Sequence, residues 1–342
     1  MRVVLSDERI PLLCGVKGFF TADSVFGVFC CKSCYISNFH PKGVYFIMKN
    51  LCRGAATALI TPMKDNGKID FASFEALVED QIKNSIDALV VCGTTGESAT
   101  LDDKEHRELI KCCVDVVNHR VPVIAGTGSN DTRYAMDLSA HACELGADML
   151  LLVTPYYNKT TQKGLVKHFE AVANVVDKPM IVYNVPSRTG LNILPETYKE
   201  LSYNEKIVAA KEANGNISAV AETIALCGDR LEIISGNDDQ IVPIMALGGV
   251  GVISVLSNVV PKETHEMCRL MHEGKVKEAA ALQLKYLDLI NALFCETNPI
   301  PIKAAMAELG FCGEDIRLPL CEMSPDKRAK MVSIMKGLNI LK

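Results

Sequence analysis

The sequence has no excess of charge of either sign and no long hydrophobic run. Its 342 residues carry a net charge of −5, with acidic and basic residues interspersed. We therefore expect the protein to bind neither nucleic acid nor a membrane surface. No apolar run approaches the length of a membrane span. With 49% hydrophobic and 23% charged residues, the composition is that of a soluble globular protein acting on a small molecule.

Motifs for phosphate and metal binding are also missing. No G-x-G-x-x-G opens a helix, and no Gly-Lys-Ser/Thr follows a glycine-rich turn. The seven histidines lie mostly in helix-like segments and form no ligand pairs, and apart from Asp238 and Asp239 the predicted strand ends lack acidic clusters. We therefore expect an enzyme without metal or cofactor.

Cysteine is abundant, yet nothing indicates disulfides. The fourteen cysteines are scattered through apolar runs of a chain too large to need covalent cross-links, so we interpret them as reduced core residues of a cytoplasmic protein. Cys30, Cys31 and Cys34 form a lone C-x-x-C, which is only a weak zinc or redox signal.

Residues 1–50 differ from the rest of the chain. They show no clear periodicity, and two acidic residues stand where a signal peptide needs basic ones. We interpret this stretch as an atypical N-terminal extension, either disordered or arising from a misassigned start. A transit peptide is the alternative.

From residue 55 onward, eight apolar runs alternate with helix-like segments. Unbroken apolar runs are typical of strands covered on both faces, and intervening helices favour parallel order with right-handed crossovers. Eight such units fit a closed (β/α)8 barrel better than an open sheet. The runs are Ala55–Met63, Ala88–Gly93, Val121–Gly128, Asp148–Tyr157, Pro179–Pro186, Ile207–Ala213, Leu231–Asp238 and Gly249–Val255.

Beyond Gly274 the pattern becomes helical. The helical segments are Val276–Leu293, Ile300–Leu309 and Ser324–Met335. We therefore predict a barrel over residues 51–275 and an appended helical region over residues 276–342.

Lys211 closes the sixth run, and a buried ammonium is strongly disfavoured unless it is paired or neutralised. A partly desolvated lysine suits Schiff-base formation with a carbonyl substrate, and a nearby phenol such as Tyr183 would serve as its proton shuttle. The alternatives are a strand-end lysine that points to solvent and a tyrosine that belongs to the core.

Two further groups at the strand ends suit an anionic substrate. The turn Gly93–Gly96, with two threonines, presents backbone N–H groups to a carboxylate, or is simply a capped glycine-rich turn. Arg188, between Pro186 and Gly190, could clamp a carboxylate in bidentate fashion, or pair with any surface acid.

Taken together, these residues resemble the dihydrodipicolinate synthase / N-acetylneuraminate lyase superfamily of Schiff-base barrels. The resemblance runs from about residue 51 to the C-terminus. It is carried by Gly-Thr-Thr-Gly-Glu-Ser at 93–98, Thr-Pro-Tyr-Tyr-Asn at 154–158, Tyr-Asn-Val-Pro-Ser-Arg-Thr-Gly at 183–190, Lys-Glu-Ala at 211–213 and Gly-Val-Ile-Ser-Val at 251–255.

The resemblance implies a reaction and a role for each site residue. Lys211 would condense with pyruvate, and the enamine would attack the aldehyde of aspartate semialdehyde on the route to lysine and diaminopimelate. The implied roles are proton transfer by Tyr183 through Thr94 to Tyr157, binding of pyruvate by Thr95 with the backbone at Gly236 and Ile253, and binding of the semialdehyde carboxylate by Arg188. In the family, the tyrosine equivalent to Tyr157 comes from a neighbouring subunit of a homotetramer, a dimer of dimers.

Two other functions remain open. One is a lyase or dehydratase of the same superfamily acting on a sugar acid, although sialic-acid lyases resemble this chain less around Arg188. The other is a non-catalytic barrel that serves as a binding or scaffold protein. Family members inhibited by lysine carry histidine and glutamate where this chain has Asp103 and Tyr134, which argues against such inhibition.

Overall fold

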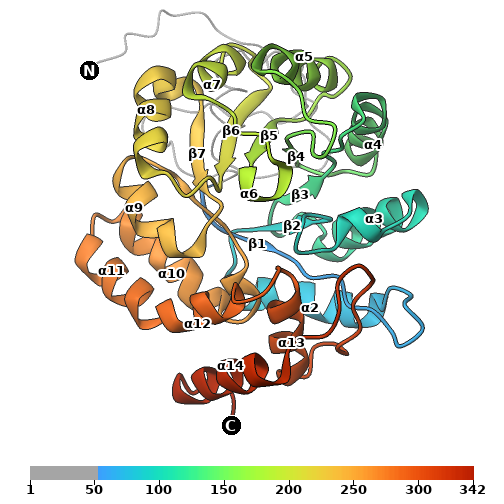
Figure 1. The fold of residues 1–342 in the computed structure, drawn as a ribbon, viewed down its shortest axis with the longest axis vertical. Helices are drawn as coiled ribbons and strands as arrows, with labels where there is room; N and C mark the ends of the chain where they lie inside the picture. Colours follow the sequence, from blue (N-terminus) through green and yellow to red (C-terminus); the bar gives the residue numbers. More distant parts are fainter. Residues whose placement is uncertain (1–52) are drawn as a thin grey trace, which may run out of the picture. The chain divides into compact units, whose positions relative to one another are not determined.

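Each of the eight predicted apolar runs overlaps one strand in the computed structural model, which describes residues 53–342. Every strand pairs in parallel with the next along the chain, and β1 pairs with β8, so the sheet closes into a barrel (Figure 1). The strands are β1 (Gly54–Ala58), β2 (Ala88–Val91), β3 (Val123–Gly126), β4 (Met149–Val153), β5 (Met180–Asn184), β6 (Ile207–Glu212), β7 (Glu232–Ser235) and β8 (Gly251–Ser254). The predicted (β/α)8 barrel is confirmed.

The unbroken apolar runs follow from two separate cores. Inside the barrel, Val90, Ile124 and Ile181 belong to one buried cluster. Their neighbours Leu89 and Val182 belong to a second cluster, which the strands share with the surrounding helices. Because successive side chains of a strand point to opposite faces, a strand buried on both faces needs apolar residues at every position.

Helices between the strands surround the barrel (Figure 1). They are α2 (Phe71–Lys83), α3 (Asp103–Val117), α4 (Thr132–Glu144), α5 (Gln162–Ala173), the one-turn α6 (Pro186–Thr189), α7 (Pro195–Leu201), α8 (Ile217–Cys227), α9 (Ile241–Ala246) and α10 (Pro261–His272). Helix α3 begins with a capping box, in which Asp102 accepts the N–H of Glu105 at 2.8 Å and Glu105 accepts that of Asp102 at 3.1 Å.

The predicted helical region at the C-terminus is present, with one difference. It contains α11 (Val276–Lys285), α12 (Leu287–Leu293), α13 (Ile300–Glu308) and α14 (Pro325–Gly337). The stretch predicted as one helix over Val276–Leu293 is two, because at Tyr286 the backbone N–H is shared between the carbonyls of Leu282 and Gln283. An N–H shared between the carbonyls three and four residues earlier is typical of the tightened last turn at which a helix ends.

The strands are shorter than the apolar runs, which extend past the strands at one or both ends. The run Asp148–Tyr157 contains β4 only as far as Val153, and Tyr157 has a left-handed backbone with a φ of 68°. An apolar run extends past its strand because the loop residues next to the barrel are themselves buried, as Leu59 and Ile60 are after β1.

The cysteines that the structure describes are free thiols, and Cys92, Cys227 and Cys268 are buried while Cys143 is partly buried. The C-x-x-C and the proposed extension over residues 1–50 lie outside the described residues.

Candidate active site

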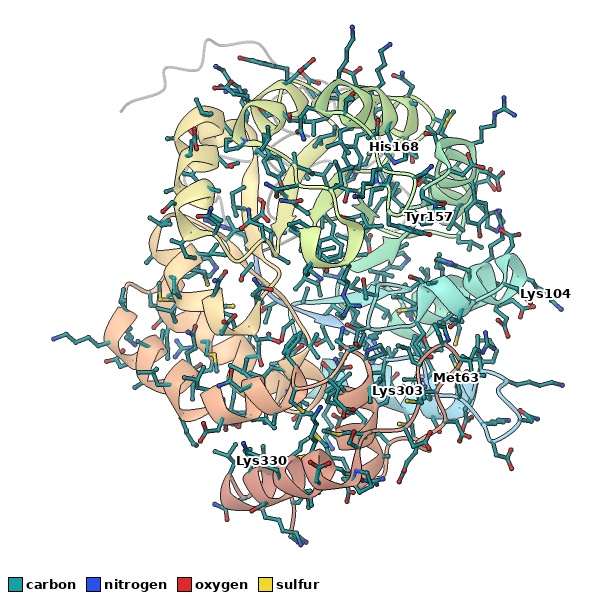
Figure 2. The ribbon with its side chains drawn as sticks, viewed as in Figure 1. Met63, Lys104, Tyr157, His168, Lys303 and Lys330 are labelled. Carbon is teal, nitrogen blue, oxygen red and sulfur yellow. The ribbon has the colours of Figure 1, made fainter. Side chains whose placement is uncertain are left out.

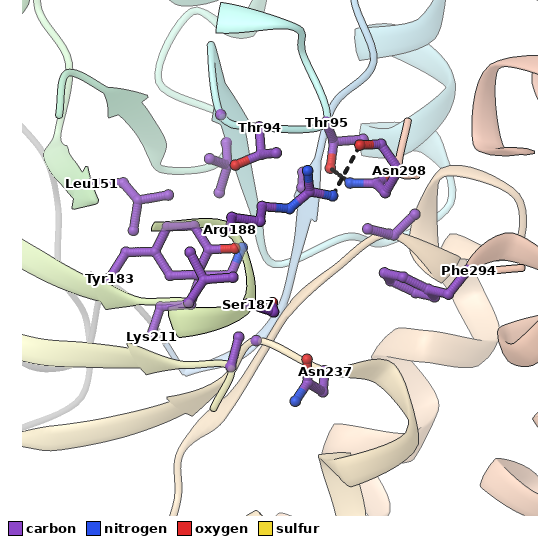
Figure 3. A pocket seen from close by; sticks show the side chains of 17 residues that line it. Thr94, Thr95, Leu151, Tyr183, Ser187, Arg188, Lys211, Asn237, Phe294 and Asn298 are labelled. Carbon is purple, nitrogen blue, oxygen red and sulfur yellow. Dashed lines mark hydrogen bonds between the residues drawn. The ribbon is translucent and has the colours of Figure 1, made fainter. Parts of the chain in front are cut away.

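Lys211 and Tyr183 lie side by side at the carboxyl end of the barrel. They are register partners on the adjacent strands β6 and β5, and the Nζ atom of Lys211 lies 4.3 Å from the centre of the Tyr183 ring. Only 7% of each residue is exposed. The two side chains point into the same cavity (Figure 3). The predicted proximity of the amine and the phenol is therefore confirmed.

Burial lowers the pKa of the Lys211 amine to about 7. This value includes the carboxylate of Asp238, which opposes the shift, and like-charge repulsion from Arg188, which adds to it. At neutral pH a large fraction of this amine is uncharged. An uncharged amine is the nucleophile that attacks a carbonyl carbon, so the site has the chemistry needed for a Schiff base.

Tyr183 lines the same cavity as Thr94, which belongs to the turn that follows β2 (Figure 3). Burial raises the pKa of the Tyr183 hydroxyl, although Arg188 and Thr94 oppose the rise. The phenol therefore keeps its proton at neutral pH and can exchange it with a neighbouring hydroxyl, as a proton shuttle requires.

Arg188 and Thr95 are held at the same end of the barrel by Asn298. The Nδ2 group of Asn298 donates to Thr95 Oγ1 at 3.0 Å, and its backbone carbonyl accepts from Arg188 Nη2 at 2.9 Å (Figure 3). Arg188 lies in α6, which begins at Pro186 and ends at Gly190 with a positive φ of 65°. The guanidinium and the threonine hydroxyl thus both line the cavity that holds the amine, as an anionic substrate would need.

These groups line a cavity of about 150 Å³. Six of the eight predicted site residues contribute to it: Thr94, Thr95, Tyr183, Arg188, Lys211 and Gly236. At Gly236 a Cβ atom would stand 2.8 Å from the Cβ of Ala213, so only glycine fits there. The cavity is small enough to favour a compact keto acid.

The two other predicted residues do not line this cavity. Ile253 lies on β8 inside the barrel and is almost fully buried. Tyr157, labelled in Figure 2, is 91% exposed. Its left-handed backbone belongs to the loop after β4, which carries the side chain out to solvent. Their roles stay predictions.

Sequence reasoning missed several cavity residues, of which Asn298 is the most important. Ser187, Asn237 and Phe294 also line the cavity. Asn298 lies in a stretch interpreted only as part of an appended helical region. The one local signal is its position before Pro299, because a proline restricts the preceding residue to an extended backbone and often stands at the start of a helix.

Behind the amine and the phenol, a second pair joins the same strands. Asn184 and Glu212 are the next register partners, and Asn184 Nδ2 donates to both carboxylate oxygens of Glu212 at 3.0 and 3.1 Å. Tyr198 on α7 donates its hydroxyl to Glu212 at 2.8 Å. Burial raises the pKa of Glu212 to about 7. This network fixes the ends of β5 and β6, and hence the two side chains in front of it.

A second cavity, of about 410 Å³, adjoins the first and shares Thr94, Val185, Arg188 and Asn298 with it. Tyr134 lines it, and burial and the neighbouring carboxylate of Asp103 raise the pKa of its hydroxyl. That carboxylate accepts from Arg107 Nε at 2.9 Å. The two positions that the family resemblance distinguishes from lysine-inhibited members thus lie next to each other.

The described part of the chain contains no group of three or more histidine, cysteine or acidic residues placed to hold a metal ion. Within residues 53–342, every helix falls short of a bilayer span in length or in apolar character.

Comparison with known proteins agrees with this geometry. The sequence profile of the Dihydrodipicolinate synthetase family matches residues 51–338. The 4-hydroxy-tetrahydrodipicolinate synthase of Clostridium tetani is 54% identical over 275 residues, which is 80% of this chain and 93% of that protein.

Solved structures give the same result. The crystal structure of dihydrodipicolinate synthase from Aquifex aeolicus superposes with a TM-score of 0.83 at 45% identity, over 84% of this chain and 98% of that one. That of the chloride-inhibited dihydrodipicolinate synthase from Acinetobacter baumannii, complexed with pyruvate, has a TM-score of 0.83 at 41% identity, over 84% of this chain and 99% of that one. The chain therefore belongs to the dihydrodipicolinate synthetase family.

Proposed function

We propose that the protein is a carbon–oxygen lyase that condenses pyruvate with L-aspartate 4-semialdehyde. The product is 4-hydroxy-tetrahydrodipicolinate, an intermediate of lysine biosynthesis through diaminopimelate. The observation that carries this proposal is a buried lysine whose amine lies against a buried phenol in a small cavity. Relatives that match most of the chain carry the name of this enzyme.

The reaction uses the amine as a covalent catalyst. Lys211 Nζ attacks the keto carbon of pyruvate, and loss of water gives an imine. The methyl carbon then loses a proton, and the resulting enamine attacks the aldehyde carbon of the semialdehyde. Finally, the amino group of the semialdehyde attacks the former keto carbon, the bond to Nζ breaks, and the ring closes.

The other site residues take the roles that the family resemblance implies. Tyr183 gives and accepts the protons of these steps, and the position of Thr94 on the wall of the same cavity supports a relay through that hydroxyl. Thr95, with the backbone at Gly236 and Ile253, holds pyruvate. Arg188 binds the carboxylate of the semialdehyde, a role supported by its position at the cavity wall.

Tyr157 completes the relay in a neighbouring subunit. Its almost full exposure in a single chain supports this assignment, because an aromatic side chain at a subunit interface is exposed until the partner covers it. We therefore propose a homotetramer built from two dimers, located in the cytoplasm. We further propose that residues 51–275 form the barrel unit and residues 276–342 its helical region.

The decisive experiment traps the imine. Incubation with pyruvate and borohydride should add the mass of the reduced adduct at Lys211, and Lys211→Met should take up none. Lys206, whose ammonium is held by the carbonyls of Ala173 and Val176, provides the control, because Lys206→Met should be labelled like the parent protein. Absence of any adduct would leave a non-catalytic binding protein as the better explanation.

Substrate choice needs a second measurement. We expect turnover of aspartate 4-semialdehyde, followed by a coupled assay, and no cleavage of N-acetylneuraminate or keto-deoxy sugar acids. Cleavage of a sugar acid without turnover of the semialdehyde would mean that the protein is a sugar-acid lyase that uses the same Schiff base.

A further inference from the structure

A buried ion pair joins the helical region to the turn that carries Thr94 and Thr95. Lys303 on α13 donates from Nζ to Glu97 Oε1 at 2.7 Å, and both side chains are 1% exposed. The same ammonium donates to the backbone carbonyl of Asp315. Figure 2 shows Lys303 within the molecule, whereas Lys104 extends from the surface of α3.

The second oxygen of Glu97 is also occupied from the C-terminal region. It accepts the backbone N–H of Arg317 at 3.1 Å. The guanidinium of Arg317 in turn donates to the carbonyls of Gly67 and Thr100 and to both carboxylate oxygens of Glu105. Lys303 and Arg317 therefore hold this one carboxylate from two sides.

Glu97 is rigidly connected to the threonines. Its backbone has a left-handed φ of 57°, unusual for a residue other than glycine, and its N–H donates to the carbonyl of Thr94 at 3.1 Å. Movement of the Glu97 carboxylate would therefore displace Thr94, whose side chain lines the cavity together with Tyr183, and Thr95, whose hydroxyl accepts from Asn298.

Stability alone does not account for such a pair. Moving two charges out of water costs several kcal/mol, and apolar residues of the same volume often stabilise a protein as well or better. What an ion pair adds is a fixed relative position of the two groups that it joins. Here it fixes the position of the turn relative to the mouth of the barrel.

We propose that Glu97, held by Lys303 and Arg317, is a positioning residue that sets the Thr94 hydroxyl in place for proton transfer with Tyr183. The helical region thus takes part in catalysis without contributing to the chemistry. This inference rests on the proposed Schiff-base function, and it deepens that function by assigning a role to a carboxylate that touches no substrate.

The test uses the double variant Glu97→Gln, Lys303→Met, which removes both charges together and so leaves no unpaired buried ion. Two properties are compared with the parent protein: the equilibrium fraction of Lys211 that borohydride traps with pyruvate, and the rate at which the methyl hydrogens of pyruvate exchange with deuterium in D2O. The second property depends on proton transfer at Tyr183 and Thr94, and the first does not.

We expect trapping to be unchanged, and both deuterium exchange and kcat to fall about 10²-fold, the scale of a misplaced catalytic group. Arg328→Gln is the matched control. Its guanidinium joins Glu308 and Glu314 in the same helical region and contacts nothing in the turn, so both properties should stay as in the parent.

A folded double variant with exchange as fast as the parent would overturn the proposal. Should the double variant not fold, Glu97→Asp takes its place, because it keeps the charge of the buried pair and shortens the side chain that holds the turn. Slower exchange with normal trapping would then support the proposal, and parental exchange would overturn it. If the parent protein itself formed no adduct with pyruvate and borohydride, the proposed function would be refuted instead. Trapping on the parent protein is therefore measured before any variant is made.

Discussion

The surroundings of the Lys211 amine determine the pH at which it reacts. Burial lowers its pKa to about 7, so below that pH the amine is increasingly protonated and unreactive. We expect the initial rate of imine formation with pyruvate to fall on the order of tenfold for each pH unit below about 7, and to level off above it. Trapping with cyanoborohydride, followed by mass spectrometry, measures this rate.

An ordinary exposed lysine would give a different curve. Its rate of imine formation would keep rising to about pH 10, the usual lysine pKa. A midpoint in that range would show that Lys211 is more hydrated than its 7% exposure indicates.

Tyr183 offers a second test at the scale of one residue. Tyr183→Phe keeps the ring that packs against Lys211 and removes only the hydroxyl, so the fold should persist. We expect kcat to drop about 10²-fold or more, as for other lost acid–base groups. Tyr203→Phe is the control, because Tyr203 is largely exposed and packs only against Arg230. Equal rates for the parent protein and Tyr183→Phe would remove the phenol from the mechanism.

At the scale of elements, the pairing of β5 and β6 depends on the buried carboxylate of Glu212. Its pKa is raised from 4.5 to about 7 in the folded protein, so the folded state binds a proton more tightly than the unfolded chain between these values. The stabilisation from this proton is complete below about pH 4.5 and is lost as the pH rises through about 7.

The corresponding variant is Glu212→Gln. We expect its free energy of unfolding, from urea titrations at several pH values, to lack the decline that the parent protein shows between pH 4.5 and about 7. Glu200→Gln, at an exposed position of the neighbouring helix α7, should keep that decline. A decline of the same size in all three proteins would mean that Glu212 does not titrate in this range.

The elements differ in how well the sequence predicts them. The strands were predictable because an unbroken apolar run of six to ten residues signals burial on both faces. Their ends were less so, since Leu59 and Ile60 continue the apolar run in a loop that is also buried. The break at Tyr286 has no local signal, because no glycine or proline marks it.

The site shows the same division. Lys211 and Tyr183 stand at strand ends, and adjacent parallel strands bring such residues together without further information. Asn298 and Lys303 contact Thr95 and Glu97 across more than two hundred positions of sequence. No periodicity or spacing in a single sequence encodes a contact of that length, and these residues became visible only in three dimensions.

At the scale of the whole molecule, the described residues that line the cavity around Lys211 lie between Ala58 and Asn298, and the family match begins at residue 51. A chain that starts at residue 51 should therefore keep the kcat and KM of the full chain in the coupled assay. Lost activity would show that residues 1–50 contribute to the enzyme.

A chain that starts at residue 60 provides the contrast. It lacks β1, which pairs with both β2 and β8, so the barrel would be left with two open edges. We expect this shorter chain to aggregate or to be degraded, which expression level and size-exclusion chromatography would show.

The position of Asn298, Lys303 and Arg317 late in the chain has a consequence for biosynthesis. All eight strands, with Lys211 and Tyr183, leave the ribosome before these three residues do. A polypeptide released before these residues are made would contain Lys211 and Tyr183, but nothing would hold the turn that carries Thr94 and Thr95. Under the proposal, full catalytic activity therefore requires translation to continue past Arg317.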